Sequence, residues 1–153
     1  MEQSEKNMRL AIKEAIKASK KGEIPVGAVI VRDGNIISKG YNLRESKQNS
    51  LNHAEIIAID KACKKLGNFR LENCDLYVTV EPCLMCAGAI VQSRIRKVYF
   101  GTRDEKYGAV TSVANAFEIK SNHKVMFEEG ICKLECEKLM KDFFRELRER
   151  KRK

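Results

Sequence analysis

Three side chains in two short stretches of the sequence are of the types that bind a catalytic zinc ion. His53 lies in the run His-Ala-Glu, and Cys83 and Cys86 lie in the run Pro-Cys-Leu-Met-Cys that begins at Pro82. One imidazole and two thiolates leave the fourth tetrahedral position of zinc for a water molecule. Glu55 supplies a nearby carboxylate, which can take up and return a proton of that water. The spacing therefore predicts a hydrolytic zinc site with Glu55 as its acid/base.

Each stretch has a simpler interpretation when it stands alone. Glu55 can be the acidic partner of a capping box with Asn52 as N-cap. Cys-x-x-Cys is also the pattern of a redox pair or of half a structural zinc site. A closed structural site would need a fourth ligand such as Cys74, and would indicate an RNA-binding module without catalysis. The combination of His-x-Glu with a later Pro-Cys-x-x-Cys is more specific, because it matches the signature of zinc deaminases, in which the glutamate is not a ligand.

The elements that must position these residues alternate between helices and strands. Apolar residues recur every three or four positions over residues 4–20, which predicts an amphipathic helix. The β-branched run 26–31, the turn Asp33-Gly34 and the pair Ile36-Ile37 predict an antiparallel hairpin. Residues 41–52 are polar and irregular, so they predict a loop that leads to the histidine.

The second half of the chain continues this alternation. His53 and Glu55 are expected in the first turn of one helix, and Pro82 is expected as the first residue of the next. Helices are indicated by one apolar face, and strands by short β-branched or aromatic runs. The predicted elements are a helix over 53–66, a strand over 75–80, a helix over 82–92, a strand over 97–100, a loop over 101–112, a strand over 125–127 and a helix from 131 to the end.

This order of elements predicts an α/β fold. Helices between strands favour a three-layer α/β/α sandwich whose mixed sheet has about five strands, antiparallel at the hairpin and parallel across the later crossovers. The chain shows no repeat or linker, and its length suits one core. Residues 1–153 are therefore expected to form a single domain with a basic C-terminal helix over about 131–153.

The composition bounds the class of protein. Lys and Arg number 30 against 21 Asp and Glu, and the formal net charge of +9 suggests a polyanionic partner but also fits a merely basic surface. The first six residues are polar and predict no signal peptide, and no stretch has the ~18 consecutive apolar residues of a membrane span. A cytoplasmic protein without a membrane contact is expected, with six cysteines that serve as metal ligands or buried thiols rather than disulfides.

Further stretches of the sequence are recognisable besides the zinc signature. They are residues 24–28, Asn42, 53–55, 77–90, 101–104 and 142–145. With them the sequence resembles the bacterial tRNA-specific adenosine deaminases of the TadA type over nearly its whole length. One stretch departs from that family: the chain has Asn49-Ser50-Leu51-Asn52 where an Asp-Pro-Thr-like run is common, which leaves the contacts of this loop open.

The resemblance implies a cytidine deaminase-like fold, a homodimer and a defined reaction. The expected reaction is hydrolytic conversion of adenosine to inosine at the wobble position of a tRNA anticodon, that of tRNA-Arg, with release of ammonia. His53, Cys83 and Cys86 would hold one zinc ion per subunit, and Glu55 would carry protons from the attacking water to the ring nitrogen and the leaving group.

The resemblance also implies residues that contact the anticodon stem-loop. Asn42 matches a substrate-contacting asparagine at the pocket, and Ala54 and Val26 are expected in the pocket walls. Asp104 matches an acidic residue next to the target base, where a carboxylate can accept a hydrogen bond from a ribose 2′-OH. Taken alone, Asp104 also fits a loop cap.

The C-terminal helix is the second expected RNA contact. Residues 141–153 carry seven basic against three acidic side chains, which suits phosphate contacts but also fits a solvated helix end. Phe143 continues the apolar stripe of the helix and is expected in the core. Phe144 is expected to stack on a splayed base, and Arg145 is expected beside it on the RNA side.

A deaminase of a free base or nucleoside, such as guanine or cytosine, is the main alternative, because it can use the same fold and zinc ligands. Neither the run over residues 80–89 nor the basic helix around 142–145 is required by a small substrate, which favours tRNA. Salt dependence separates the two, since a neutral base releases no counterions when it binds.

Overall fold

A mixed five-stranded sheet organises the chain, in the strand order β2-β1-β3-β4-β5. The computed structural model describes residues 2–152. Strand β1 pairs antiparallel with β2 and β3, whereas β4 is parallel to both of its neighbours. The predicted hairpin and parallel crossovers are therefore confirmed. The strands are β1 (Gly27–Arg32), β2 (Asn35–Tyr41), β3 (Cys74–Val80), β4 (Lys97–Thr102) and β5 (Met126–Glu129).

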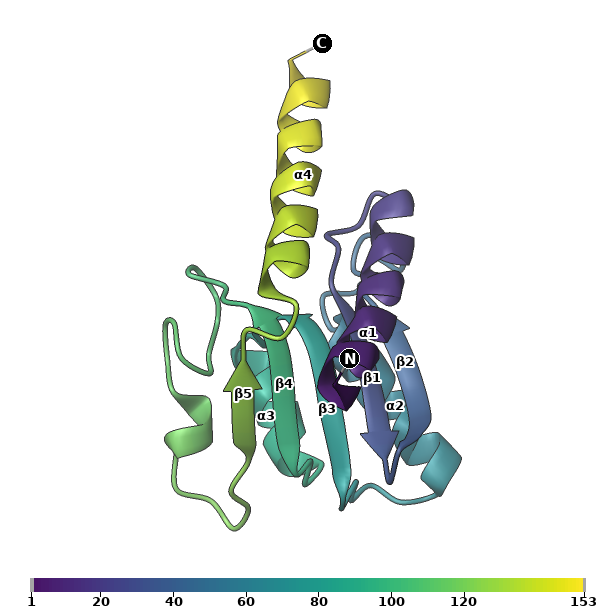
Figure 1. Cartoon of the computed structure of the whole chain (residues 1–153), viewed down its shortest axis with the longest axis vertical. Helices are drawn as coiled ribbons and strands as arrows, with labels where there is room; N and C mark the ends of the chain where they lie inside the picture. The colour runs from purple at the N-terminus through teal and green to yellow at the C-terminus, as the bar shows by residue number, and fades with distance from the viewer. Residues whose placement is uncertain (1, 153) are drawn as a thin grey trace.

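Helices cover both faces of the sheet, which confirms the three-layer α/β/α sandwich (Figure 1). Helices α1 and α4 pack on one face, and α2 and α3 pack on the other. Within residues 2–152, no helix is long and apolar enough to cross a membrane. The helices are α1 (Gln3–Lys20), α2 (Ala54–Leu66), α3 (Leu84–Gln92) and α4 (Lys133–Lys151), with a short 3₁₀ helix η1 (Ala116–Glu118) before β5.

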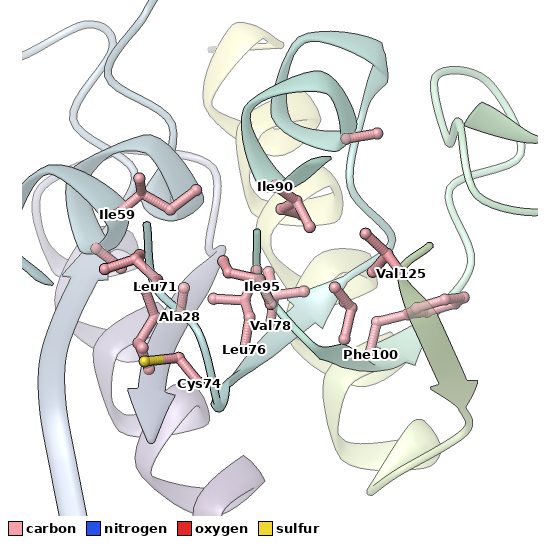
Figure 2. Close-up of a cluster of buried hydrophobic side chains, with 14 of the residues drawn as sticks. Ala28, Ile59, Leu71, Cys74, Leu76, Val78, Ile90, Ile95, Phe100 and Val125 are labelled. Carbon is pink, nitrogen blue, oxygen red and sulfur yellow. The ribbon is translucent and has the colours of Figure 1, made fainter. Parts of the chain in front are cut away.

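Alternate residues of the central strands build two cores. In β1, Ala28 and Ile30 belong to the core under α2 and α3, whereas Val29 and Val31 belong to the core under α1. Figure 2 shows the first of these cores, in which Ile90 of α3 lies over the side chains of the sheet. Because successive side chains of a strand point to opposite faces, both faces of the sheet can bury apolar residues against a layer of helices.

The two helices next to the zinc-donor residues, α2 and α3, both begin later than predicted. Helix α2 begins at Ala54, and His53 is its N-cap with extended backbone (φ −75°, ψ 153°). Helix α3 begins at Leu84 rather than Pro82, and Cys83 is its N-cap (φ −75°, ψ 177°). No side-chain cap bond starts α2, so the capping-box interpretation of Asn52 is wrong.

A long-range backbone contact explains the late start of α3. The Ala109 amide donates to the Pro82 carbonyl over 2.9 Å, and Cys83 forms an isolated antiparallel bridge with Gly108. These bonds hold residues 82–83 extended, since a helical backbone could not pair with the neighbouring loop.

The last helix also begins later than predicted, at Lys133. Gly130 and Cys132 have positive φ values of 84° and 54°, which no α-helix can include. The preceding strand runs over Met126–Glu129 rather than 125–127.

Close approach of α1 to the sheet requires a glycine at the start of β1. In Gly27→Ala, the new Cβ would lie 2.0 Å from the Ala11 carbonyl oxygen and 2.4 Å from the Ala15 amide nitrogen, both in the α1 backbone. Because neither atom can rotate away, we expect a loss of about 1–3 kcal/mol in the free energy of unfolding, measured in urea. Gly88→Ala in α3 is the matched control, because its Cβ meets nothing within 4 Å, and it is expected to stabilise by up to about 1 kcal/mol. Equal unfolding midpoints for the two variants would contradict this account.

Candidate active site

Three metal donors converge beyond one end of β3. Nδ1 of His53 lies 3.6 Å from Sγ of Cys83 and 3.5 Å from Sγ of Cys86. Tetrahedral zinc, with Zn–N of about 2.0–2.1 Å and Zn–S of about 2.3 Å, separates nitrogen from sulfur by about 3.5 Å. The donor atoms therefore have the spacing of a zinc site, and they form the only such group of His, Cys, Asp or Glu in the described chain.

Cys74 is not part of this cluster. It is the first residue of β3, whereas the donors follow the opposite end of that strand, after Val80. Six steps along a strand separate these ends by about 20 Å. The closed four-ligand site with Cys74 is therefore wrong, and the three donors leave one zinc position open.

The N-termini of α2 and α3 both face this cluster, because their N-cap residues are His53 and Cys83. The positive end of a helix dipole stabilises thiolate. The hydrogen bond from Cys86, and then that from His53, lowers the pKa of Cys83 to about 4. The bond to Cys83 and burial raise the pKa of Cys86. A divalent cation can hold both sulfurs as thiolates, so this donor chemistry fits zinc.

Glu55 is a buried carboxyl group beside the donors. It lies in the first turn of α2, has 4% of its surface exposed and lines the same pocket as His53 and Cys83. Burial raises the pKa of Glu55 to about 7. A carboxyl group with a pKa near neutrality can both accept and return a proton.

A pocket of about 900 Å³ opens over the donors and is large enough for a nucleoside. It brings together segments from both halves of the chain with the C-terminal helix. Arg145 is the one predicted contact residue that does not line it. The other predicted contact residues in its lining are Val26, Asn42, Ala54, Asp104 and Phe144, whose roles in binding stay predictions.

The side chain of Asn42 is held by the backbone around it. Nδ2 of Asn42 donates to the Ile24 carbonyl over 3.3 Å, and Oδ1 accepts the Arg44 amide over 3.2 Å. The amide group has a second hydrogen and a second lone pair, so it can still contact a substrate. These bonds fix its orientation at the pocket wall.

Asp104 does cap its own loop. Its Oδ1 accepts the amides of Lys106 and Tyr107 over 3.1 and 3.0 Å. The same residue is half-buried and lines the pocket, and both cap bonds use only Oδ1. The capping interpretation is thus confirmed, and it is compatible with a contact from Oδ2 to a ribose hydroxyl.

Phe143 lies in the core as predicted, and Phe144 lines the pocket, while its stacking on a base stays a prediction. Phe143 is 7% exposed, whereas Phe144 is 37% exposed and meets it edge to face at a centroid distance of 5.4 Å. Arg145 pairs with Asp142, with 3.2 Å between Nη1 and Oδ1. Figure 1 shows α4 rising beyond the end of the sheet, so its basic last turns project past the domain.

Five further lining residues lie outside the stretches that resemble the family and were not predicted from the sequence. Tyr107 and Lys106 follow Asp104 in a polar loop, and loop composition alone does not indicate which side chains turn inward. Met140 had a usable signal, because it lies four residues before Phe144 on the same helix face. The remaining two are Arg44 and Ser50, the latter in the loop that departs from the family pattern.

Comparison with known proteins identifies the family. A family model described as the cytidine and deoxycytidylate deaminase zinc-binding region matches residues 1–102, which include all three donors and Glu55. The tRNA-specific adenosine deaminase of Bacillus subtilis (strain 168) is 50% identical over 153 residues, which cover 99% of this chain and 95% of that protein. The chain belongs to the tRNA-specific adenosine deaminases.

Solved structures resemble this deaminase in fold. A structure from work on tRNA:A34 deaminases that act at the wobble position has a TM-score of 0.85 and 41% identity, covering 88% of this chain and 98% of its own. Guanine deaminase of Bacillus subtilis has a TM-score of 0.64 and 35% identity, covering 84% and 85%. The cytidine deaminase-like fold is thus confirmed.

Removal of any donor from the deaminase is expected to remove the metal. His53→Ala, Cys83→Ser and Cys86→Ser should each lower zinc affinity by at least about tenfold, because even loss of a group that only supports a ligand has an effect of that size. Metal analysis of purified protein and competition with a chelator measure it. Cys74→Ala is the control and should keep its zinc, whereas an equal loss there would restore the four-ligand interpretation.

Proposed function

We propose that this deaminase hydrolyses the wobble adenosine of a tRNA anticodon, that of tRNA-Arg, to inosine and ammonia. The observation that carries this proposal is the buried carboxyl group of Glu55 beside three zinc donors at the floor of a nucleoside-sized pocket. The named relatives support tRNA as the substrate.

Zinc held by His53, Cys83 and Cys86 would supply a water molecule with a pKa lowered to about 7. Glu55 then accepts a proton from the water that attacks C6 of adenine. It returns protons to the ring nitrogen and to the departing amino group, which leaves as ammonia. The near-neutral pKa of Glu55, raised by burial, suits both steps.

The pocket walls orient the base for this attack. Val26 and Ala54 offer apolar contacts to the ring, and Asn42 offers a fixed amide group. Asp104 has an oxygen available for the ribose 2′-OH beside the target base. These contacts recognise a nucleotide within RNA rather than a base alone.

The C-terminal helix α4 contacts the stem-loop outside the zinc site. Phe144 lines the pocket and presents an exposed ring on which a neighbouring base can stack. The last turns of α4 project past the sheet (Figure 1), and the basic side chains of this helix, which include Arg145, can neutralise phosphates. Binding of the stem-loop is therefore expected to weaken as salt rises.

The remaining parts of the proposal concern the assembly and its place in the cell. One zinc ion per chain suits the one donor cluster of the described residues. A homodimer is supported by exposed apolar side chains near the pocket, such as Leu84 at 64% exposure and Leu51 at 55%. A single domain of residues 1–153 that acts on tRNA would work in the cytoplasm.

Deamination of a free base is the competing function, because guanine deaminase shares this fold. A small neutral base needs neither Phe144 nor the basic turns of α4. Phe144 lines the pocket and the basic turns follow it in the same helix, which favours RNA.

The decisive test compares substrates. Zinc-loaded protein is expected to form inosine in a tRNA-Arg anticodon stem-loop with adenosine at the wobble position, and to leave free adenosine, guanine and cytosine unchanged. Glu55→Gln keeps the shape of the side chain but cannot relay protons, so kcat should fall by about 10²–10⁴. Zinc content is measured in parallel and should be unchanged. Turnover of a free base with the stem-loop untouched would overturn the proposal.

A second test concerns the aromatic contact. Phe144→Ala is expected to raise KM for the stem-loop at least about fivefold, because stacking on an aromatic ring contributes about 1–3 kcal/mol per base. Leu134→Ala is the matched control, since Leu134 is 80% exposed at the other end of α4. Equal KM values for the two variants would remove Phe144 from the RNA contact.

A further inference from the structure

Two buried carboxylates outside the catalytic group each hold one loop of the pocket. Glu81 is 3% exposed and precedes the zinc-binding cysteines. Its Oε2 accepts the amides of Val110, Thr111 and Ser112 over 3.0, 2.7 and 3.0 Å. Its Oε1 accepts the Asp104 amide over 3.1 Å and the Ser112 hydroxyl. One side chain therefore joins both ends of loop 104–112.

Loop 104–112 is shaped around this carboxylate. A Cβ at Gly108 would lie 2.3 Å from both Cδ and Oε1 of Glu81, so only glycine permits this approach. The loop carries Asp104, Lys106 and Tyr107 into the pocket lining. Of these three residues, Asp104 is the one whose backbone amide binds Glu81 directly.

Glu23 has the same role for a second loop of the pocket. It is 2% exposed and lies between α1 and β1. Its Oε1 accepts the Glu45 amide over 3.1 Å, and its Oε2 accepts the amide and hydroxyl of Ser46 over 2.6 and 2.5 Å. Burial opposes ionisation, but the hydrogen bonds from Ser46 and the Glu45 amide prevail and lower the pKa of Glu23. This bond set holds the loop that carries Arg44 into the pocket lining.

We propose that Glu81 and Glu23 are positioning residues that set the two loops of the pocket for RNA, so that Glu81 acts through Asp104 and Glu23 acts through Arg44. The expected effect on RNA binding rests on the proposed function, whereas the expected effect on the conformation of the two loops does not. Hydrogen bonds to a carboxylate are stronger than bonds between neutral groups, and removing a donor from a buried carboxylate lowers the stability of the folded protein. Each of two loops that line the pocket is therefore held by its own buried carboxylate.

Hydrogen exchange tests the supports without any substrate. In Glu81→Gln, the new amide group faces N–H donors, and exchange at residues 110–112 should become at least about tenfold faster, the factor that follows from losing a bond to a charged acceptor. Exchange at residues 45–46 should stay unchanged. Glu23→Gln should give the reverse pattern. Unchanged exchange at the bonded amides, or equal acceleration in both loops, would overturn the proposal.

Double-mutant cycles then test the action on RNA. Glu81→Gln is expected to raise KM for the stem-loop about tenfold with kcat changed less than about twofold, since the zinc donors and Glu55 keep their places. In the Asp104→Ala background the effect of Glu81→Gln on KM should shrink below about twofold. Glu23→Gln should keep its effect there and lose it in the Arg44→Ala background instead. If each glutamine variant changes KM by the same factor in both backgrounds, Glu81 does not act through Asp104 and Glu23 does not act through Arg44.

Two serine variants and the wild-type activity distinguish failure of this proposal from failure of the proposed function. Ser112→Ala and Ser46→Ala each remove one hydroxyl donor and keep the carboxylates, so they should change KM in the same direction but less, even if a glutamine variant fails to fold. If both serine variants match the wild type in hydrogen exchange and in KM, then Glu81 and Glu23 do not hold the two loops. Wild-type protein that leaves the stem-loop unmodified would refute the proposed function, whereas the exchange pattern would still decide on the two supports.

Discussion

Beneath the pocket, an imidazole, two sulfurs and a carboxyl group lie together, with the three donor atoms within 4.8 Å of one another. Cys86 and Glu55 are buried, and His53 and Cys83 are partly buried. Polar groups are costly to bury unless charge and hydrogen bonds compensate them. Here the compensation comes from a cation-binding geometry and from two helix N-termini that point at the same place. The sheet must bring α2 and α3 together for this to happen. The order of the strands serves that convergence, and so does Gly40 in β2, where an added Cβ would lie 2.6 Å from the Ala54 carbonyl oxygen of α2.

Much of this arrangement could be predicted from the sequence, because local signals agree with the fold. The two-residue period of the strands, the Asp33-Gly34 turn and the apolar faces of the helices gave the correct layers and strand directions. The zinc donors were also predictable, since Cys83 and Cys86 are close along the chain and few chemistries use such a pair with a His-x-Glu. Phe143 and Phe144 were separable by helical period alone.

The parts that escaped prediction depend on contacts between distant residues. The start of α3 is delayed because the backbone of Ala109 and Gly108 pairs with Pro82 and Cys83. The inward turn of Tyr107 depends on how its loop is held, and the residue that holds it, Glu81, lies 26 positions earlier. No periodicity or composition encodes such a bond, because it exists only once the sheet has formed.

Glu55, Glu23 and Glu81 are buried acids of two kinds, and their surroundings explain the division. Glu55 lies in a site where burial dominates, so its pKa rises toward neutrality and the group can exchange protons. Glu23 and Glu81 are buried to the same degree but accept several N–H and O–H donors, and the pKa of each is lowered. A carboxylate that stays charged and fully bonded cannot relay protons, but it can fix a backbone. The number of donors around each carboxyl group thus decides the direction in which its pKa moves, although the three side chains are chemically identical.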